Sequence, residues 1–188
     1  MAVAGSNIAR LMIGVGLALL AWASYESGFF GAIRTREAVS PTLATFYMHE
    51  SFKVGYWEYS VNRAVRSRWL GRGMSAQKTT GEFIVVFMTA TNNDSSASTL
   101  PFPVLKDRRQ REYSARPTFG VGIRGEDLSI VTLNPGVSRQ GYFVFEVPQD
   151  TSTLQVVLSG GLRSNQTAIV PLELDQLRVN SDLDSNDL

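Results

Sequence analysis

Alternating apolar and polar positions run through the chain from about residue 45 to about residue 175. Residues 81–91 (GEFIVVFMTAT) have apolar side chains on both faces, which is typical of a central strand that is covered on both sides. Residues 138–147 (SRQGYFVFEV) alternate, with three side chains expected to face the core: Phe143, Phe145 and Val147. These two segments predict the centre of a β-sheet.

Other strands are predicted from short β-favouring runs, which are separated by turn-forming residues. They are residues 52–61, 100–105, 128–133, 154–159 and 168–174, with a return strand beginning at Tyr113. In the first of these runs, one face is expected to hold Trp57, Tyr59 and Val61 and the other Phe52, Val54 and Tyr56. Two prolines restrict residues 100–105 to an edge strand, and Asn134-Pro135-Gly136 fits a type II turn. Because no segment after residue 31 keeps a 3.6-residue apolar period, we expect an all-β sandwich of seven to nine strands.

The N-terminal segment predicts export. Residues 11–23 (LMIGVGLALLAWA) form an apolar run behind Arg10, and a helix of that length spans about 20 Å, less than the roughly 30 Å hydrocarbon core. Ala21-Trp22-Ala23 is a small-x-small triplet of the kind that precedes signal-peptidase cleavage. Residues 1–30 are therefore interpreted as a cleaved secretory signal peptide or an uncleaved single-span anchor with interfacial aromatic residues. A buried core helix is the third interpretation.

The rest of the chain divides into three parts. Residues 31–48 are predicted to be a linker, or a first edge strand from Thr42 onward, and residues 49–175 to be the sandwich. A domain of that size can bury enough apolar surface to fold without disulfides. Residues 176–188 are acidic and poor in apolar side chains, so a mobile tail is expected there.

Composition excludes several kinds of chemistry. The 188 residues contain no cysteine and a single histidine, His49. Disulfides, thiolate nucleophiles, cysteine-ligated metals, attachment of lipid to cysteine and histidine-rich metal sites are therefore excluded. His49 lies at a linker–strand junction and no Gly-x-Ser-x-Gly elbow accompanies it, so we expect a surface or capping side chain. We expect no enzymatic activity, no catalytic residue, no metal and no cofactor.

Three other groups of residues contain side chains or backbone that could carry chemistry. Glu126-Asp127 would be the carboxylate pair of a hydrolase. Asn92-Asn93-Asp94 together with Asp107 would supply the oxygen ligands of a calcium ion. Gly120-Val121-Gly122 would form a phosphate-binding loop. None has the spacing of a dedicated site, and each is explained more simply as a turn.

Charge is unevenly distributed along the chain. Residues 51–124 carry 12 basic and 5 acidic side chains, whereas residues 125–188 carry 3 basic and 9 acidic ones. Two basic clusters, both expected in loops, are Arg63, Arg66, Arg68, Arg72 and Lys78 around Trp69, and Lys106, Arg108, Arg109 and Arg111 at a hairpin tip. The favoured interpretation is that they contact the acidic half of the chain. The alternative is an anionic partner, such as lipid headgroups, an envelope polymer or an acidic protein; nucleic acid is not expected after export.

Three ordered blocks resemble a bacterial family. They are residues 81–86 running to the turn at 91–94, residues 105–107 followed by Arg111-Glu112-Tyr113, and residues 133–136 followed by 141–148. Together with residues 54–61 they resemble, over about residues 50–160, the telokin-like, immunoglobulin-like domain of unknown function of secreted and membrane-anchored bacterial proteins. Two features depart from that family: Gln110 stands where its hairpin has glycine, and the lipid-attachment cysteine of many relatives is absent. The resemblance implies an immunoglobulin-like antiparallel sandwich and an extracytoplasmic location, without an agreed activity.

These observations lead to two functional hypotheses. The first is a non-enzymatic, exported module of the cell envelope, extracellular or periplasmic, that recognises a protein partner through the surface of its sandwich. The second is a binding protein for a small anionic or lipid ligand, or for an anionic envelope polymer, that uses the basic clusters. An uncleaved N-terminal helix would also tether the chain to the membrane.

Overall fold

The computed structural model describes residues 42–71, 76–118 and 123–176. The expected signal or anchor, the linker up to residue 41, Arg72, Gly120-Val121-Gly122 and the tail from residue 177 lie outside these described residues. Within them, no helix has the length and apolar character needed to span a bilayer.

Nearly all regular structure in the described residues is β-strand. The strands are β1 (Thr42–Thr45), β2 (Ser51–Val54), β3 (Trp57–Leu70), β4 (Gln77–Asn92), β5 (Ser98–Thr99), β6 (Val104–Asp107), β7 (Glu112–Ser114), β8 (Glu126–Asp127), β9 (Thr132–Leu133), β10 (Ser138–Val147), β11 (Leu154–Ser159), β12 (Gln166–Pro171) and β13 (Leu174–Gln176), with a 3₁₀ helix at Leu128–Ile130. The expectation of an all-β fold is confirmed.

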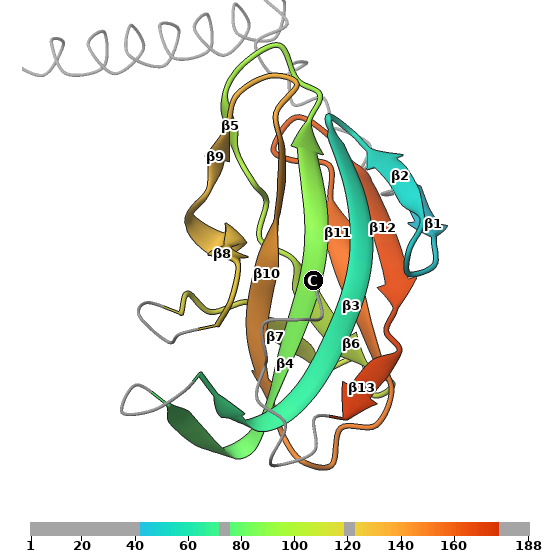
Figure 1. Ribbon diagram of the computed structural model, residues 1–188. Helices are drawn as coiled ribbons and strands as arrows, with labels where there is room; N and C mark the ends of the chain where they lie inside the picture. The colour runs from blue at the N-terminus through green and yellow to red at the C-terminus, as the bar shows by residue number, and fades with distance from the viewer. Residues whose placement is uncertain (1–41, 72–75, 119–122, 177–188) are drawn as a thin grey trace, which may run out of the picture. The chain divides into compact units, whose positions relative to one another are not determined.

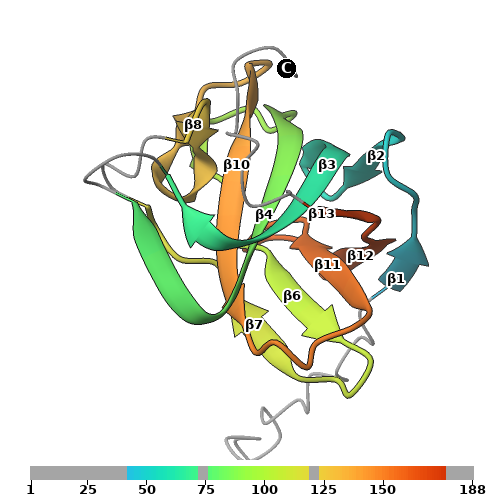
Figure 2. The same ribbon diagram turned by 60° about the horizontal axis from the view of Figure 1, so that its bottom comes forward.

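The strands form two main sheets (Figure 1). One has the order β1-β12-β11-β6-β7 and the other β13-β3-β4-β10-β8, with β2 paired to β3; β5 and β9 form a separate small pair. In both views β3, β4 and β10 lie in one layer and β6, β11 and β12 in the other (Figures 1 and 2). The arrangement is sandwich-like.

Strand β4 lies at the centre of its sheet and is covered on both faces, as expected. Ile84, Val86 and Met88 belong to the core between the two sheets, together with side chains of β6, β11 and β12. Phe83 and Phe87 face the other way into a second apolar cluster that includes Leu70 of β3 and Ile123 of a loop. Burying each large apolar side chain contributes about 1.5–3 kcal/mol, so burial on both faces holds β4 firmly in the sandwich.

Strands β10 and β11 and the turn at Asn134–Gly136 are confirmed. The two strands have the predicted bounds, and the three side chains expected in the core are buried there: Phe143, Phe145 and Val147. Val137 N donates to Asn134 O over 3.1 Å, and Gly136 has a φ of +72°. That conformation is the one a type II turn requires at its third residue, where glycine is unstrained.

The expectation of one strand over residues 52–61 is wrong. These residues form a hairpin, because Gly55 has a φ of +59° and the chain reverses between Val54 and Trp57. A glycine with positive φ at the first central position is what a type II′ hairpin needs. Phe52 pairs with Tyr59, so both rings face the same core, with centroids 6.2 Å apart. Tyr56 lies in the turn and is exposed.

Residues 128–133 do not form the single strand that was expected. Leu128–Ile130 is a 3₁₀ helix between the two-residue strands β8 and β9. Asp127 accepts a hydrogen bond from Ser129 N at 2.9 Å, and so caps the first turn of this helix. A capping aspartate competes with strand formation because its carboxylate satisfies a backbone N–H locally.

Candidate functional site

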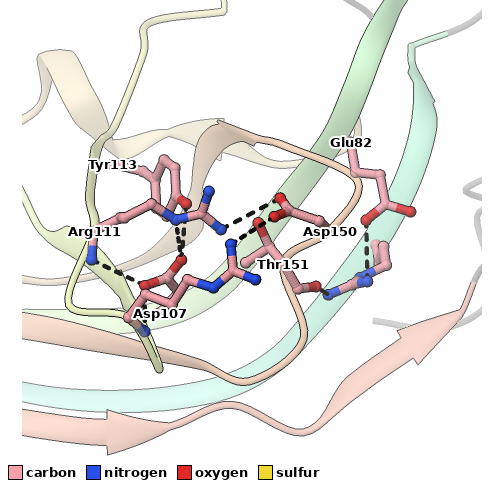
Figure 3. A network of polar contacts seen from close by, with 8 residues as sticks. Glu82, Asp107, Arg111, Tyr113, Asp150 and Thr151 are labelled. Carbon is pink, nitrogen blue, oxygen red and sulfur yellow. Dashed lines mark hydrogen bonds and ion pairs between the residues drawn. The ribbon is translucent and has the colours of Figure 1, made fainter.

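The loop at residues 148–151 joins β10 to β11 and brings the two basic clusters together. From β3, Arg66 Nη2 donates to Thr151 O at 2.8 Å and Arg68 Nη2 to Gln149 Oε1 at 3.3 Å. From the β6–β7 hairpin, Arg109 Nη1 and Arg111 Nη2 donate to the two carboxylate oxygens of Asp150, at 2.9 and 3.3 Å (Figure 3). Clusters about 40 residues apart in the sequence therefore meet at neighbouring residues of one loop.

We call this region the basic end. It comprises the loop at 148–151 and eight side chains: Arg66, Arg68, Trp69, Lys78, Lys106, Arg108, Arg109 and Arg111. The expectation that both clusters lie in loops is wrong for the first, because β3 runs for 14 residues to Leu70. Arg63, Arg66 and Arg68 are on this strand and Lys78 is on β4. The second cluster does lie at a hairpin tip, between β6 and β7.

The β6–β7 hairpin is organised by Asp107. This side chain is buried, and it accepts hydrogen bonds from the backbone N–H groups of Arg109 and Arg111, from Arg111 Nε at 2.6 Å and from Tyr113 Oη at 3.0 Å (Figure 3). Burial alone would raise the pKa of Asp107, but the hydrogen bonds from Arg111 and Tyr113 outweigh it and lower the pKa to about 2. Gln110 completes the turn with a φ of +61°, a conformation that favours glycine.

Most cations of the two clusters are paired with carboxylates of the same chain. The ion pairs are Arg63–Asp175, Arg66–Glu82, Lys106–Glu112, Arg109–Asp150, Arg111–Asp107 and Arg111–Asp150, at 2.6–3.3 Å. The expected contact with the acidic half of the chain is seen for Arg63, Arg109 and Arg111, through Asp175 and Asp150. It is not seen for Arg66 and Lys106, because their partners Glu82 and Glu112 belong to the basic half itself.

Three cations of the basic end have no carboxylate partner within the described part of the chain. They are Arg68, Lys78 and Arg108, all exposed. Arg68 bonds only the neutral Gln149, and Lys78 Nζ lies 5.1 Å from the centroid of the Trp69 ring. Trp69 itself is 46% exposed.

A β-bulge presents Trp69 to solvent. The register between β3 and β4 shifts between Ser67 and Trp69, and the backbone N and O of Trp69 both bond to Ser67 Oγ, at 3.1 and 2.6 Å. Bulges of this kind redirect a side chain and end regular pairing. The indole is therefore outside the sheet while its backbone polar groups are satisfied.

The opposite end of the sandwich carries exposed apolar side chains on three loops. Tyr56, Phe102 and Leu162 are 42%, 51% and 109% exposed. Tyr56 precedes β3 and Phe102 precedes β6, whereas the basic end follows both strands, so the two regions lie at opposite ends. We call these three residues the apolar end. No sequence pattern marks them as a group, and the one signal is that they neighbour turn-forming glycine and proline.

A close backbone contact joins the loop of Tyr56 to the loop of Leu162, and the loop of Phe102 lies beside them. A Cβ placed on Gly55 would lie 2.6 Å from Gly160 O, and one placed on Gly161 would lie 3.9 Å from Pro101 Cγ. Gly55 N also donates to the side chain of Gln166 at 2.7 Å. The three tips therefore project from a packed base.

His49 lies in a turn at the rim of a shallow depression. It has a φ of +69°, and its backbone N donates to Val61 O at 2.8 Å. The depression has a volume of about 390 Å³ and is lined by Met48, His49, Asn62, Arg63, Ala64, Phe87, Gln140, Glu173 and Asp175. The Arg63–Asp175 ion pair spans part of its wall. His49 is exposed, as expected.

The remaining candidate ligands have structural roles. Asp127 accepts from Thr118 N at 2.6 Å as well as from Ser129, and although burial raises its pKa, these hydrogen bonds lower it overall. Asn92 is buried at the end of β4 near the apolar end, far from Asp107 at the basic end, so the oxygen groups considered for calcium are not brought together. In the described residues, no group of three or more histidine, aspartate or glutamate side chains could hold a metal ion.

Comparison with known proteins agrees with this architecture. The described residues define an all-β, sandwich-like domain. Residues 46–169 match the family described as a domain of unknown function (DUF4352), and the chain belongs to that family. Its structure is similar to the crystal structure of the YjhA protein from Bacillus subtilis, with a TM-score of 0.54 and 17% sequence identity, over 68% of this chain and 99% of that chain. No curated protein matches it.

Proposed function

We propose that the chain is a non-enzymatic, exported module of the cell envelope with an immunoglobulin-like sandwich, and that it recognises a protein partner through the apolar end. The observation that carries this proposal is the exposure of Tyr56, Phe102 and Leu162 on three loops packed against one another. Large apolar and aromatic side chains are enriched at the centres of protein interfaces.

The energetics favour such a role. Each Å² of apolar surface that a partner covers contributes about 25 cal/mol, and the three neighbouring tips provide a small centre of binding. The loops are held at their bases by Gly55, Gly160 and Gly161, so little conformational entropy is lost when a partner binds.

Export is supported by the sequence. A basic residue, an apolar run of residues 11–23 and the Ala21-Trp22-Ala23 triplet together have the form of a signal peptide or anchor. Mass analysis of the mature protein tests this, since a start at Ser24 indicates cleavage and an intact Met1 indicates an anchor. Recovery of the full-length chain in the cytosolic fraction would contradict export.

The recognition surface is tested by site-specific crosslinking in native membranes. A photoreactive amino acid at Tyr56 or Leu162 is expected to capture one partner, and the variant Tyr56→Ser/Phe102→Ser/Leu162→Ser to lose it. The matched control is Ile130, which is 61% exposed but lies on the 3₁₀ helix. The same partner crosslinked equally from Ile130, or unchanged binding by the triple variant, would overturn the proposal.

A further inference from the structure

We propose that the basic end is a docking surface for an anionic lipid bilayer, with Arg68, Lys78 and Arg108 contacting headgroup phosphates and Trp69 entering the interface. This inference goes beyond the proposed function, because it concerns the opposite end of the sandwich and a different partner.

The structure first separates the cations that are available from those that are not. Arg66, Lys106, Arg109 and Arg111 are held by carboxylates of the chain itself, whereas Arg68, Lys78 and Arg108 are exposed without such a partner among the described residues. The sequence alone shows one long basic stretch and one basic hairpin. Among the members of the two clusters that the structure describes, three are left without a carboxylate partner.

Arg68 contacts the loop at residues 148–151 directly, and the other two cations are each one residue or one contact away from a residue beside it. Arg68 contacts Gln149, and Arg109, the neighbour of Arg108, contacts Asp150. Gln149 and Asp150 are adjacent, with Cα atoms about 3.8 Å apart. The β3–β4 and β6–β7 hairpins therefore reach the same short segment. Lys78 belongs to this group through its contact with the Trp69 ring. The three cations are therefore at the same end of the sandwich, where one anionic surface would meet them.

Trp69 favours a bilayer over an acidic protein. Tryptophan is enriched where membranes meet water, because its ring is apolar and its N–H is polar. Moving a strand tip into a medium of low dielectric is costly when its backbone groups are unpaired. Both backbone groups of Trp69 bond to Ser67 Oγ, so this residue can enter the interface without that cost.

Binding of the full chain to vesicles tests the proposal. Phosphatidylcholine vesicles with phosphatidylglycerol are compared with pure phosphatidylcholine, since apolar insertion of the N-terminal segment does not depend on lipid charge. We expect Arg68→Ala/Lys78→Ala/Arg108→Ala to lose about 100-fold in affinity for the anionic vesicles, because each basic side chain at such a surface contributes about fivefold. The control Lys53→Ala/Arg139→Ala/Arg163→Ala removes the same charge elsewhere and is expected to bind normally.

Orientation gives a second, independent readout. The chain has no cysteine, so Gln77→Cys at the basic end and Ser95→Cys at the apolar end can each carry a single environment-sensitive fluorophore. We expect a blue shift on anionic vesicles at position 77, abolished by high salt and reduced by Trp69→Ser, and none at position 95. A shift at position 95 instead, equal losses in the two triple variants, or binding to polyglutamate without binding to vesicles would each overturn the proposal.

Discussion

The hydroxyl of Tyr113 donates a hydrogen bond to the buried carboxylate of Asp107 over 3.0 Å, across the mouth of the β6–β7 hairpin. The same carboxylate oxygen accepts from Arg111 Nε, and the other accepts from two backbone N–H groups of the turn. One side chain thus satisfies two backbone N–H groups of the hairpin tip and also binds the side chains of Arg111 and Tyr113. Asp107 and Tyr113 both belong to the second block that resembles the bacterial family, and this contact explains their spacing.

Removal of the tyrosine hydroxyl is expected to destabilise the fold. Tyr113→Phe leaves the ring in place and deletes one donor to a charged acceptor, a change that costs about 1.5–3 kcal/mol. Urea denaturation monitored by circular dichroism measures the difference. Tyr47→Phe is the control, because Tyr47 is 67% exposed; equal stability of the Tyr113 variant and the wild type would show that the contact contributes nothing.

The pH dependence of stability follows from Asp107. Its folded-state pKa of about 2 is below the ordinary value of 3.8. The stabilisation it contributes is therefore complete above about pH 4 and lost as the pH falls toward 2. The free energy of unfolding, measured by denaturation at several pH values between 5 and 2, is expected to fall more steeply with decreasing pH for the wild type than for Asp107→Asn. Parallel curves would contradict the lowered pKa.

Gln110 is expected to be a strained position. A non-glycine residue with positive φ costs about 1–2 kcal/mol, and Gln110 has a φ of +61° and an exposed side chain. Gln110→Gly should therefore raise the free energy of unfolding by about 1 kcal/mol. The neighbouring exposed Arg108 does not have a positive φ, so Arg108→Gly is expected to be neutral or destabilising. A glycine that destabilises position 110 as well would argue against strain there.

Strands with strong local patterns were predicted correctly from the sequence. In β4 both faces are apolar, and in β10 every second residue from Phe143 to Val147 faces the core between the sheets, so neither pattern suits a helix or a loop. The hairpin at Gly55 was missed because aromatic residues on both sides of it also suit one continuous strand. Only the glycine marks the reversal, and a single glycine is compatible with either structure.

The candidate site could be predicted only in part. Sequence identified the basic residues, but which of them are available depends on contacts between distant segments. Arg63 meets Asp175 across 112 positions, and Arg109 meets Asp150 across 41. Such pairings follow from the order of strands in the two sheets. The apolar end was missed for the same reason, because Tyr56, Phe102 and Leu162 become neighbours only after folding.

Asn92 provides a last test of how the loops near the apolar end are held. It is fully buried; its Nδ2 donates to the carbonyl oxygens of Ser96 and Leu133, each at 2.9 Å, and its Oδ1 accepts from Asp94 N. In Asn92→Asp a carboxylate would face two carbonyl oxygens with no proton to donate. The expected loss is about 3 kcal/mol at pH 7, because buried acceptors are left unpaired and a charge is buried beside them. The loss should shrink as the pH falls and the new carboxyl group becomes protonated.

Asn165→Asp, at an exposed position, is the control and should change little. Denaturation at pH 7 and pH 5 measures both variants, and an Asn92→Asp protein as stable as the control would show that this side chain does not hold the loops.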